Sequence, residues 1–127
     1  MKALTARFPD ARIGKRRKKR RDGREVYDIE FTQAGRKLEA DIFADGTIHN
    51  WQQQVAAGDL PEPVVQAVAR LFPKSRMKEI MAVTAVSNGT ERREGYEIAV
   101  RRARKRDIEV TIAPDGRVLE GPGVEIK

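Results

Sequence analysis

The chain has 127 residues and a formal net charge of +7, and 39% of its residues are hydrophobic. This length predicts one domain, or two small units that share a sheet. The absence of cysteine excludes disulfides, thiolate metal sites and cysteine nucleophiles. No run of residues approaches the roughly 18 apolar positions of a membrane span, and the first ten residues hold no apolar signal core.

The first half of the chain predicts a short helix followed by four strands. The helix ends at Phe8-Pro9, because the residue before a proline is pushed out of the helical region. We interpret it as the remainder of a longer helix whose start has been trimmed; the alternative is a native start with a shorter helix. The four strands are expected at residues 12–20, 25–31, 37–43 and 47–55.

The second half predicts a complete helix over residues 60–73, LPEPVVQAVARLFP. Pro61 and Pro63 suit a helix N-terminus, where a missing N–H costs nothing. The apolar residues that follow recur at helical spacing, and Pro73 ends the helix. Four strands are expected after it, at residues 76–86, 95–102, 107–113 and 117–121.

The two halves repeat one another. The matching segments are Phe8-Pro9 with Phe72-Pro73, Tyr27-Asp28-Ile29 with Tyr96-Glu97-Ile98, and 38–48 with 108–118. One helix with four strands is marginal alone, so we expect two such units to share a core. The predicted fold class is α+β: one antiparallel sheet with both helices on one face and an open second face. The predicted organisation is a single domain, 1–127, with repeats at 1–55 and 60–121 and a tail at 122–127.

Turn chemistry predicts which residues face the open side of the sheet. In residues 113–116, APDG, Pro114 fits the second position of a type I turn and Gly116 the left-handed position after it, which pairs Ile112 with Val118. Carried to the matching FADG, residues 43–46, the same register gives the pairs Ile42 with Ile48, Asp41 with His49, and Glu39 with Trp51. It therefore predicts His49 and Trp51 on the open face, near Phe43.

Basic residues are concentrated in two segments. Residues 15–24 hold eight Lys or Arg, and residues 92–106 hold seven. A turn near Asp22-Gly23 would place Arg17 opposite Asp28 and Lys15 opposite Glu30. The candidate basic patch is Arg17, Lys18, Lys19, Arg20, Arg21, Arg102, Arg104 and Lys105. Such segments attract polyanions or an acidic protein surface; the alternative is a solvated hairpin that only keeps the protein soluble. No aromatic residues interleave with residues 15–24, which argues against readout of single-stranded nucleic acid.

The sequence offers no catalytic constellation. His49 is the only histidine, and Ser75 and Ser87 are the only serines. Neither serine sits in a nucleophile elbow, and one histidine with scattered carboxylates is a poor metal site. We therefore expect no enzyme activity and no cofactor or metal.

Several short motifs resemble the PepSY-like family, whose fold is that of β-lactamase inhibitory protein. They are Leu60-Pro61, Phe72-Pro73, Tyr96-Glu97-Ile98 and Asp115-Gly116, with first-half counterparts Phe8-Pro9, Tyr27-Asp28-Ile29 and Asp45-Gly46. The resemblance implies a bacterial, exported protein, periplasmic or extracellular, that presents a concave sheet face to a partner protein in an inhibitor-like or chaperone-like role. The two basic segments depart from the family pattern.

These observations predict a non-catalytic module that binds another protein through its open sheet face. Its partner-binding residues would be Trp51, His49 and Phe43, because aromatic anchors dominate the energy of protein interfaces. The alternative reading of Trp51 is a core residue. The alternative function is binding of a polyanion, either nucleic acid or an anionic envelope polymer, through the basic hairpins at 15–24 and 92–106.

Overall fold

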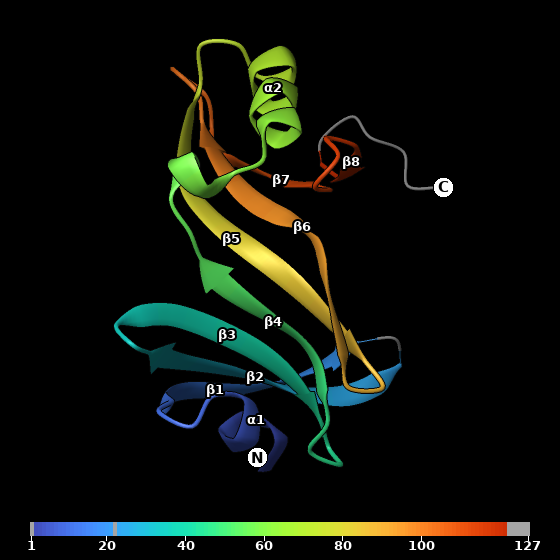
Figure 1. Cartoon of the computed structure of the whole chain (residues 1–127). Helices are drawn as coiled ribbons and strands as arrows, with labels where there is room; N and C mark the ends of the chain where they lie inside the picture. The colour runs from blue at the N-terminus through green and yellow to red at the C-terminus, as the bar shows by residue number, and fades with distance from the viewer. Residues whose placement is uncertain (1, 22, 122–127) are drawn as a thin grey trace. The chain divides into compact units, whose positions relative to one another are not determined.

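The computed structural model describes residues 2–21 and 23–121 of the chain, so the predicted tail at 122–127 lies outside the described residues. The fold is α+β, and its eight strands are hydrogen-bonded in chain order, β1 to β8, in one open antiparallel sheet. The elements are α1 (Lys2–Arg7), β1 (Arg12–Arg21), β2 (Arg24–Gln33), β3 (Arg36–Phe43), β4 (Ile48–Gln54), the 3-10 turn η1 (Ala57–Asp59), α2 (Glu62–Leu71), β5 (Arg76–Ser87), β6 (Thr90–Arg101), β7 (Ile108–Ile112) and β8 (Val118–Glu120). Every predicted helix and strand is present (Figure 1).

The chain divides into two compact units. Of the described residues, the first unit contains 2–21, 23–53 and 84–92, and the second contains 54–83 and 93–121. The boundaries differ from those of the predicted repeats, because the outer half of the β5–β6 hairpin packs with the first unit. Two tandem repeats therefore stay a prediction.

In the first unit, α1 covers one face of the strands that follow it (Figure 1). Leu4 and Phe8 are buried against side chains that alternate along β2 and β3, as the pleat of a strand requires. The Phe8 ring lies 5.0 Å from that of Phe31 and 5.3 Å from that of Trp51, centroid to centroid. The buried cluster is Leu4, Phe8, Ile29, Phe31, Leu38, Ala40, Ile42 and Trp51.

In the second unit, α2 packs in the same way on strands of its own. Pro61 and Pro63 stand at its N-terminus as predicted, and Val64, Ala67 and Val68 form its buried face. They contact alternate residues of β5, β6 and β7. The buried cluster is Leu60, Val64, Ala67, Val68, Ile80, Ala82, Tyr96, Ile98, Val100, Val110 and Ile112.

The hairpins β3–β4 and β7–β8 contain the same turn. Phe43 N–H donates to Thr47 O at 2.9 Å and Ala113 N–H to Arg117 O at 2.8 Å. Gly46 and Gly116 follow with φ of +91° and +95°, the left-handed region that glycine enters without strain. The predicted pairs Ile42 with Ile48 and Ile112 with Val118 are confirmed.

Beyond each of these turns the register shifts by one residue. Asp41 pairs with Asn50 rather than His49, and Trp51 pairs with Ala40 rather than Glu39. Thr111 likewise pairs with Glu120. A β-bulge, in which two residues oppose one, explains both shifts. The predicted pairs Asp41 with His49 and Glu39 with Trp51 are therefore wrong.

The β1–β2 hairpin confirms one predicted pair and contradicts another. Arg17 lies opposite Asp28, and Arg21 lies opposite Arg24. A third bulge, between Ile13 and Arg16, interrupts the register, so the expected pair of Lys15 with Glu30 is absent. Asp22 lies outside the described residues.

We predict that Gly116→Ala destabilises the fold by about 1–3 kcal/mol, a typical cost of a strained backbone position. A Cβ at Gly116 would lie 2.8 Å from Pro63 O, in addition to the unfavourable φ. The matched control is Gly58→Ala, where a Cβ meets nothing within 4 Å. Urea unfolding of both variants measures the difference, and equal midpoints would contradict the prediction.

Candidate binding surfaces

The strands β2, β3 and β4 turn a polar face away from α1, which we call the acidic face. Since Ile29, Ala40 and Trp51 point toward α1, their neighbours along each strand point the other way. Residues that lie directly opposite one another share a face, so the register groups Asp28 with Asp41 and Asn50, and Glu30 with Glu39 and Gln52. The acidic face thus consists of Asp28, Glu30, Glu39, Asp41, Asn50 and Gln52, together with the aromatic residues described below.

The acidic face holds carboxylates opposite carboxylates. Such like-charge pairs across strands are destabilising. Lys19 offsets part of the repulsion: its Nζ lies 3.1 Å from Asp41 Oδ1 and 3.4 Å from Asp28 Oδ2. Asn50 Nδ2 also donates to Asp41 Oδ2 at 3.0 Å, and both residues are buried, 4% and 3% exposed. The centre of the face is therefore a hydrogen-bonded polar cluster.

Burial is the largest cause that raises the pKa of Glu39 above its usual value, and the charges of Asp28 and Glu30 raise it further. Lys37 and Lys19 act in the opposite direction. The raised pKa of Glu39 thus reflects its partial burial first and the neighbouring carboxylates second.

Phe43 and His49 lie together at one end of the acidic face. Their ring centroids are 5.2 Å apart in a nearly perpendicular arrangement. Asn50 Nδ2 is 2.8 Å from His49 Nδ1, so that ring nitrogen accepts when the proton is on Nε2. The guanidinium of Arg24 stacks 3.7 Å from the Phe43 centroid. The two residues predicted to be neighbours are thus brought together, although the bulge had not been foreseen.

Trp51 lies on the other side of the sheet, so its predicted place on the open face is wrong. It is 6% exposed and packs edge-on against Phe8. Its Nε1 donates to Glu91 Oε2 at 3.1 Å. Arg7 pairs with the same carboxylate at 2.6 Å and lies over the Trp51 ring at 5.1 Å. Trp51 is therefore a fixed part of the core.

A groove of about 700 Å³ opens at the end of the first unit where Phe43 lies. Its walls are mainly apolar, and Arg7, Arg24 and Glu91 stand among them. This volume is in the range of pockets that hold small molecules or anchor side chains. The other lining residues are Ala3, Ala6, Thr47, Ile48, Val86, Ser87, Asn88 and Gly89.

The basic segment on β1 is exposed along most of its length. Lys18 Nζ lies 3.4 Å from Glu25 Oε1, and Arg20 donates to Gly23 O at 3.1 Å. Lys19 is turned toward the acidic face, as described above. The side chain of Arg21 lies outside the described residues.

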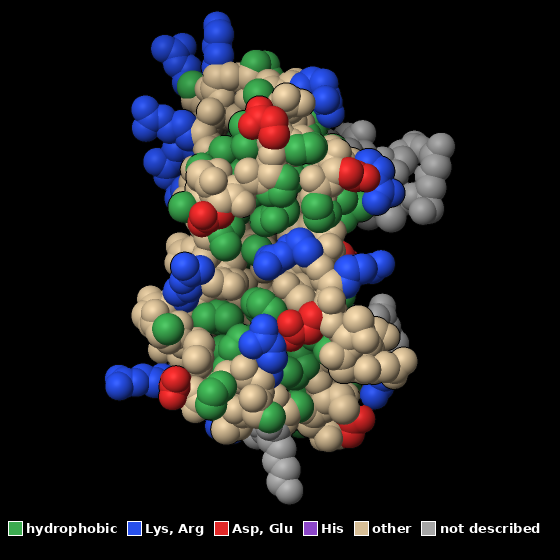
Figure 2. All heavy atoms as spheres, in the orientation of Figure 1, with side chains coloured by type: hydrophobic (Ala, Val, Ile, Leu, Met, Phe, Trp, Pro, Cys, Tyr) green, Lys and Arg blue, Asp and Glu red, His purple; other side chains and the backbone are tan. Residues whose placement is uncertain are grey.

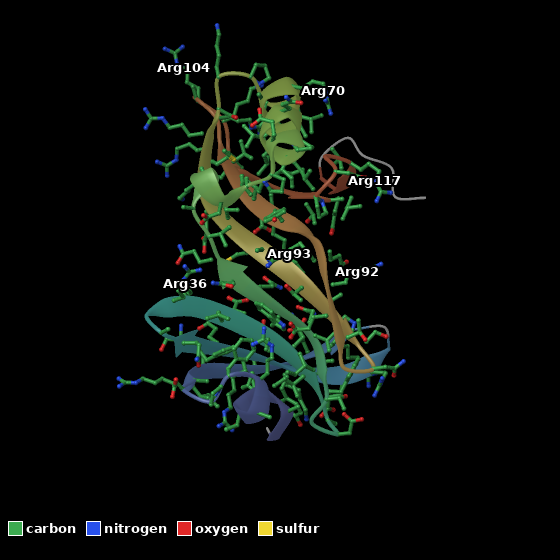
Figure 3. All side chains as sticks on the ribbon, in the orientation of Figure 1. Arg36, Arg70, Arg92, Arg93, Arg104 and Arg117 are labelled. Carbon is green, nitrogen blue, oxygen red and sulfur yellow. The ribbon has the colours of Figure 1, made fainter. Side chains whose placement is uncertain are left out.

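The second basic segment surrounds the loop between β6 and β7. Arg102 donates to Arg106 O at 3.1 Å, which closes the loop on itself. Arg104 adopts a φ of +58° and is exposed, as is Lys105. In Figure 3, Arg104 points away from the strands, and Figure 2 shows several Lys and Arg side chains projecting from the surface in that region.

Within residues 2–21 and 23–121, no group of three or more His, Cys, Asp or Glu side chains has the geometry to hold a metal ion. No helix in that part of the chain is both long enough and apolar enough to cross a bilayer.

We predict that Trp51→Ala lowers the free energy of unfolding by about 3–5 kcal/mol, because it removes a large buried side chain. Trp51→Phe retains the ring contact with Phe8 and should cost less. Denaturant unfolding followed by circular dichroism measures both. A Trp51→Ala variant as stable as the parent would contradict the core placement.

We also predict that Glu39→Gln stabilises the protein at pH 7 by about 0.5 kcal/mol, the scale of one cross-strand pair. Since the folded-state pKa of Glu39 lies above its ordinary value of 4.5, the native state binds the proton more tightly, and stability falls as pH rises through this window. The gain from the variant should therefore shrink below about pH 4.5. Glu109→Gln removes the same charge from an exposed position opposite Ala99 and should show no such pH dependence; parallel profiles for the two variants would refute the prediction.

No protein-family model and no curated protein sequence matches the chain. The fold, however, is similar to those of solved structures from Bacteroides. A BLIP-like protein from Bacteroides fragilis aligns over 94% of this chain and 80% of its own, with a TM-score of 0.65 and 13% identity. A DUF2874 family protein from Bacteroides uniformis aligns over 94% and 83%, with a TM-score of 0.72 and 14% identity.

A third structure, from Bacteroides eggerthii, is described as a "putative periplasmic" protein; it aligns over 94% of this chain and 82% of its own, with a TM-score of 0.73 and 17% identity. At such identities the likeness concerns the fold alone. The chain therefore has a BLIP-like fold, named for the β-lactamase inhibitory protein.

Proposed function

We propose that this protein is a non-catalytic module that binds another protein through the acidic face. The observation that carries the proposal is the pair of facing carboxylates Glu30 and Glu39, on the same face of the sheet as two adjacent aromatic rings. Like-charge pairs cost the free protein stability, and a basic partner would relieve that cost. The partner would therefore present Lys or Arg side chains to this face.

The groove beside Phe43 supplies the apolar part of the contact. Phe43 borders both the groove and the acidic face. A partner segment with an apolar side chain near a basic one could bury the first in the groove and pair the second with the carboxylates. Buried anchors surrounded by polar contacts are the usual source of affinity in protein interfaces.

His49 supports a binding role better than a catalytic one. Its ring packs against Phe43, and its Nδ1 lies beside the Asn50 amide. A general base needs a reacting group within hydrogen-bond reach and a partner that tunes its basicity. The described contacts of His49 fix the ring as a surface element of the acidic face instead.

The BLIP-like fold supports an inhibitor-like or chaperone-like role for this protein, and the neighbour described as "putative periplasmic" supports a location outside the cytoplasm. We further propose that the chain consists of two tandem PepSY-like repeats. These remain parts of the proposal. A second candidate function is polyanion binding by the basic segments 15–24 and 92–106, favoured by the exposure of Arg17, Arg20, Arg104 and Lys105.

Charge reversal on the acidic face tests the proposal. We predict that Glu30→Lys with Glu39→Lys abolishes capture of the partner from an extract of the source cells. Glu109→Lys with Glu120→Lys makes the same change of charge at exposed positions of the second unit and should retain it. Phe43→Ala should weaken capture by about tenfold or more, as expected for an interface anchor.

Salt separates the two candidate functions. The apolar contact of the groove beside Phe43 should keep part of the affinity for a protein partner at about 0.5 M NaCl, although the ion pairs with the acidic face weaken, whereas a contact of phosphate type is released. Equal capture by both double variants, or complete release by salt of everything that is bound, would overturn the proposal. The second outcome would favour the polyanion.

A further inference from the structure

The strand β1, Arg12–Arg21, stands at the edge of the sheet, and β2 is the only strand that pairs with it among residues 2–21 and 23–121. In an antiparallel pair, alternate residues direct their backbone N–H and C=O groups toward the partner strand, and the others direct them away. A row of backbone donors and acceptors therefore faces outward along β1. Such an edge can accept a further strand.

Cations line both sides of this edge. Arg16 and Lys18 lie opposite Ile29 and Tyr27, which places them on the face that α1 covers elsewhere. Arg17 and Lys19 alternate with them and lie on the side of the acidic face. An added strand would thus run between two rows of positive charge.

Part of this charge is not compensated within the protein. Lys18 and Lys19 are engaged by Glu25, Asp28 and Asp41. Lys15, Arg16 and Arg17 are exposed, and none of them has an ion-pair partner among the described residues. Lys15 lies in the bulge, and Arg16 and Arg17 begin the regular part of β1 that follows it.

We propose that β1 accepts an acidic, extended segment of another protein as an additional strand. The backbone edge supplies hydrogen bonds, and the two rows of cations select Asp and Glu on both faces of the incoming strand. The same charges repel a second copy of β1, so the edge is closed to self-association and open to an acidic strand. A nucleic acid would meet the cations but would leave the backbone edge unused, and β1 carries no aromatic side chain on which bases could stack.

The proposal rests on the proposed role as a protein-binding module but uses a different surface. The acidic face would select a basic partner, and the β1 edge an acidic one. Variants of the acidic face and of β1 can therefore fail independently.

The test uses the complete chain and a fluorescent peptide as long as β1 that repeats Glu-Glu-Thr-Thr, so that Glu side chains lie on both faces of the extended peptide. Two modified peptides carry N-methyl groups on half of their amides. In the first, every second amide is methylated, so one edge of the extended peptide keeps all its N–H donors. In the second, the same number of consecutive amides is methylated, so both edges of the extended peptide lose donors. Charge, composition and number of methyl groups are identical.

We expect the first modified peptide to bind nearly as tightly as the parent. The second should bind about tenfold more weakly or worse, because several backbone hydrogen bonds at about 1 kcal/mol each are lost. Fluorescence anisotropy measures both. Equal binding of the two modified peptides would overturn the proposal in favour of a simple polyanion contact, and absence of binding by the parent peptide would overturn it outright.

The protein is varied in parallel. We expect a triple variant to bind the parent peptide with about tenfold lower affinity, the combined scale of three exposed ion pairs. The variant combines Lys15→Gln, Arg16→Gln and Arg17→Gln. A control triple variant removes the same charge from exposed positions of the second unit and should leave the affinity for the parent peptide nearly unchanged. It combines Arg70→Gln, Lys74→Gln and Arg76→Gln. The double variant Glu30→Lys with Glu39→Lys should not lower the affinity for the parent peptide. This result would show that the β1 site does not depend on the acidic face. Equal losses in the two triple variants would show that only net charge matters and would overturn the proposal.

Discussion

The packing of the first unit depends on the pleat of β3 and β4 and on a one-residue β-bulge in the pairing of these two strands. A strand alternates its side chains between two faces, so the pairing of one residue determines the face of all the others. The bulge after Ile42 and Ile48 reverses that alternation on β4. It places Trp51 under α1 against Phe8, and it places Asn50 beside Asp41.

The same bulge separates the two kinds of chemistry in this unit. On the side of α1, the rings of Phe31 and Trp51 pack against Phe8, and the indole N–H of Trp51 donates to Glu91, which also pairs with Arg7. The opposite face collects carboxylates and amides. A chain with a net charge of +7 therefore carries a local excess of negative charge, bounded by the cations of β1. This division gives the first unit a surface rich in carboxylates and an edge rich in cations.

The likeness to the Bacteroides structures concerns backbone architecture. At 13–17% identity, the likeness does not allow the role of a side chain in one protein to be assigned to a side chain in the other. The fold accounts for an open sheet that offers a surface, and the side chains of this chain decide what that surface attracts. The acidic face and the basic β1 edge are both properties of this sequence placed on a shared fold.

Much of the architecture followed from local patterns. Proline and the apolar period located α2, and alternation located the strands. The Asp-Gly turns gave the first pair of each hairpin, Ile42 with Ile48 and Ile112 with Val118. The acidic face could also have been recognised, because Asp28 and Glu30 alternate in β2 as Glu39 and Asp41 do in β3.

What the sequence alone determined was therefore the class of fold, the order of its elements and the turns between them, since these depend on interactions within a few residues. Only the tertiary structure decided the face of Trp51, the partner of Asp41 and the pairing of Lys15, whereas His49 lies near Phe43 as the sequence predicted. Each of the three depends on a bulge, in β4 for Trp51 and the partner of Asp41 and in β1 for Lys15. On β4, the register after the bulge lets Trp51 pack under α1 and lets Asn50 donate a hydrogen bond to Asp41 on the other side, and these contacts join segments that lie apart in the sequence.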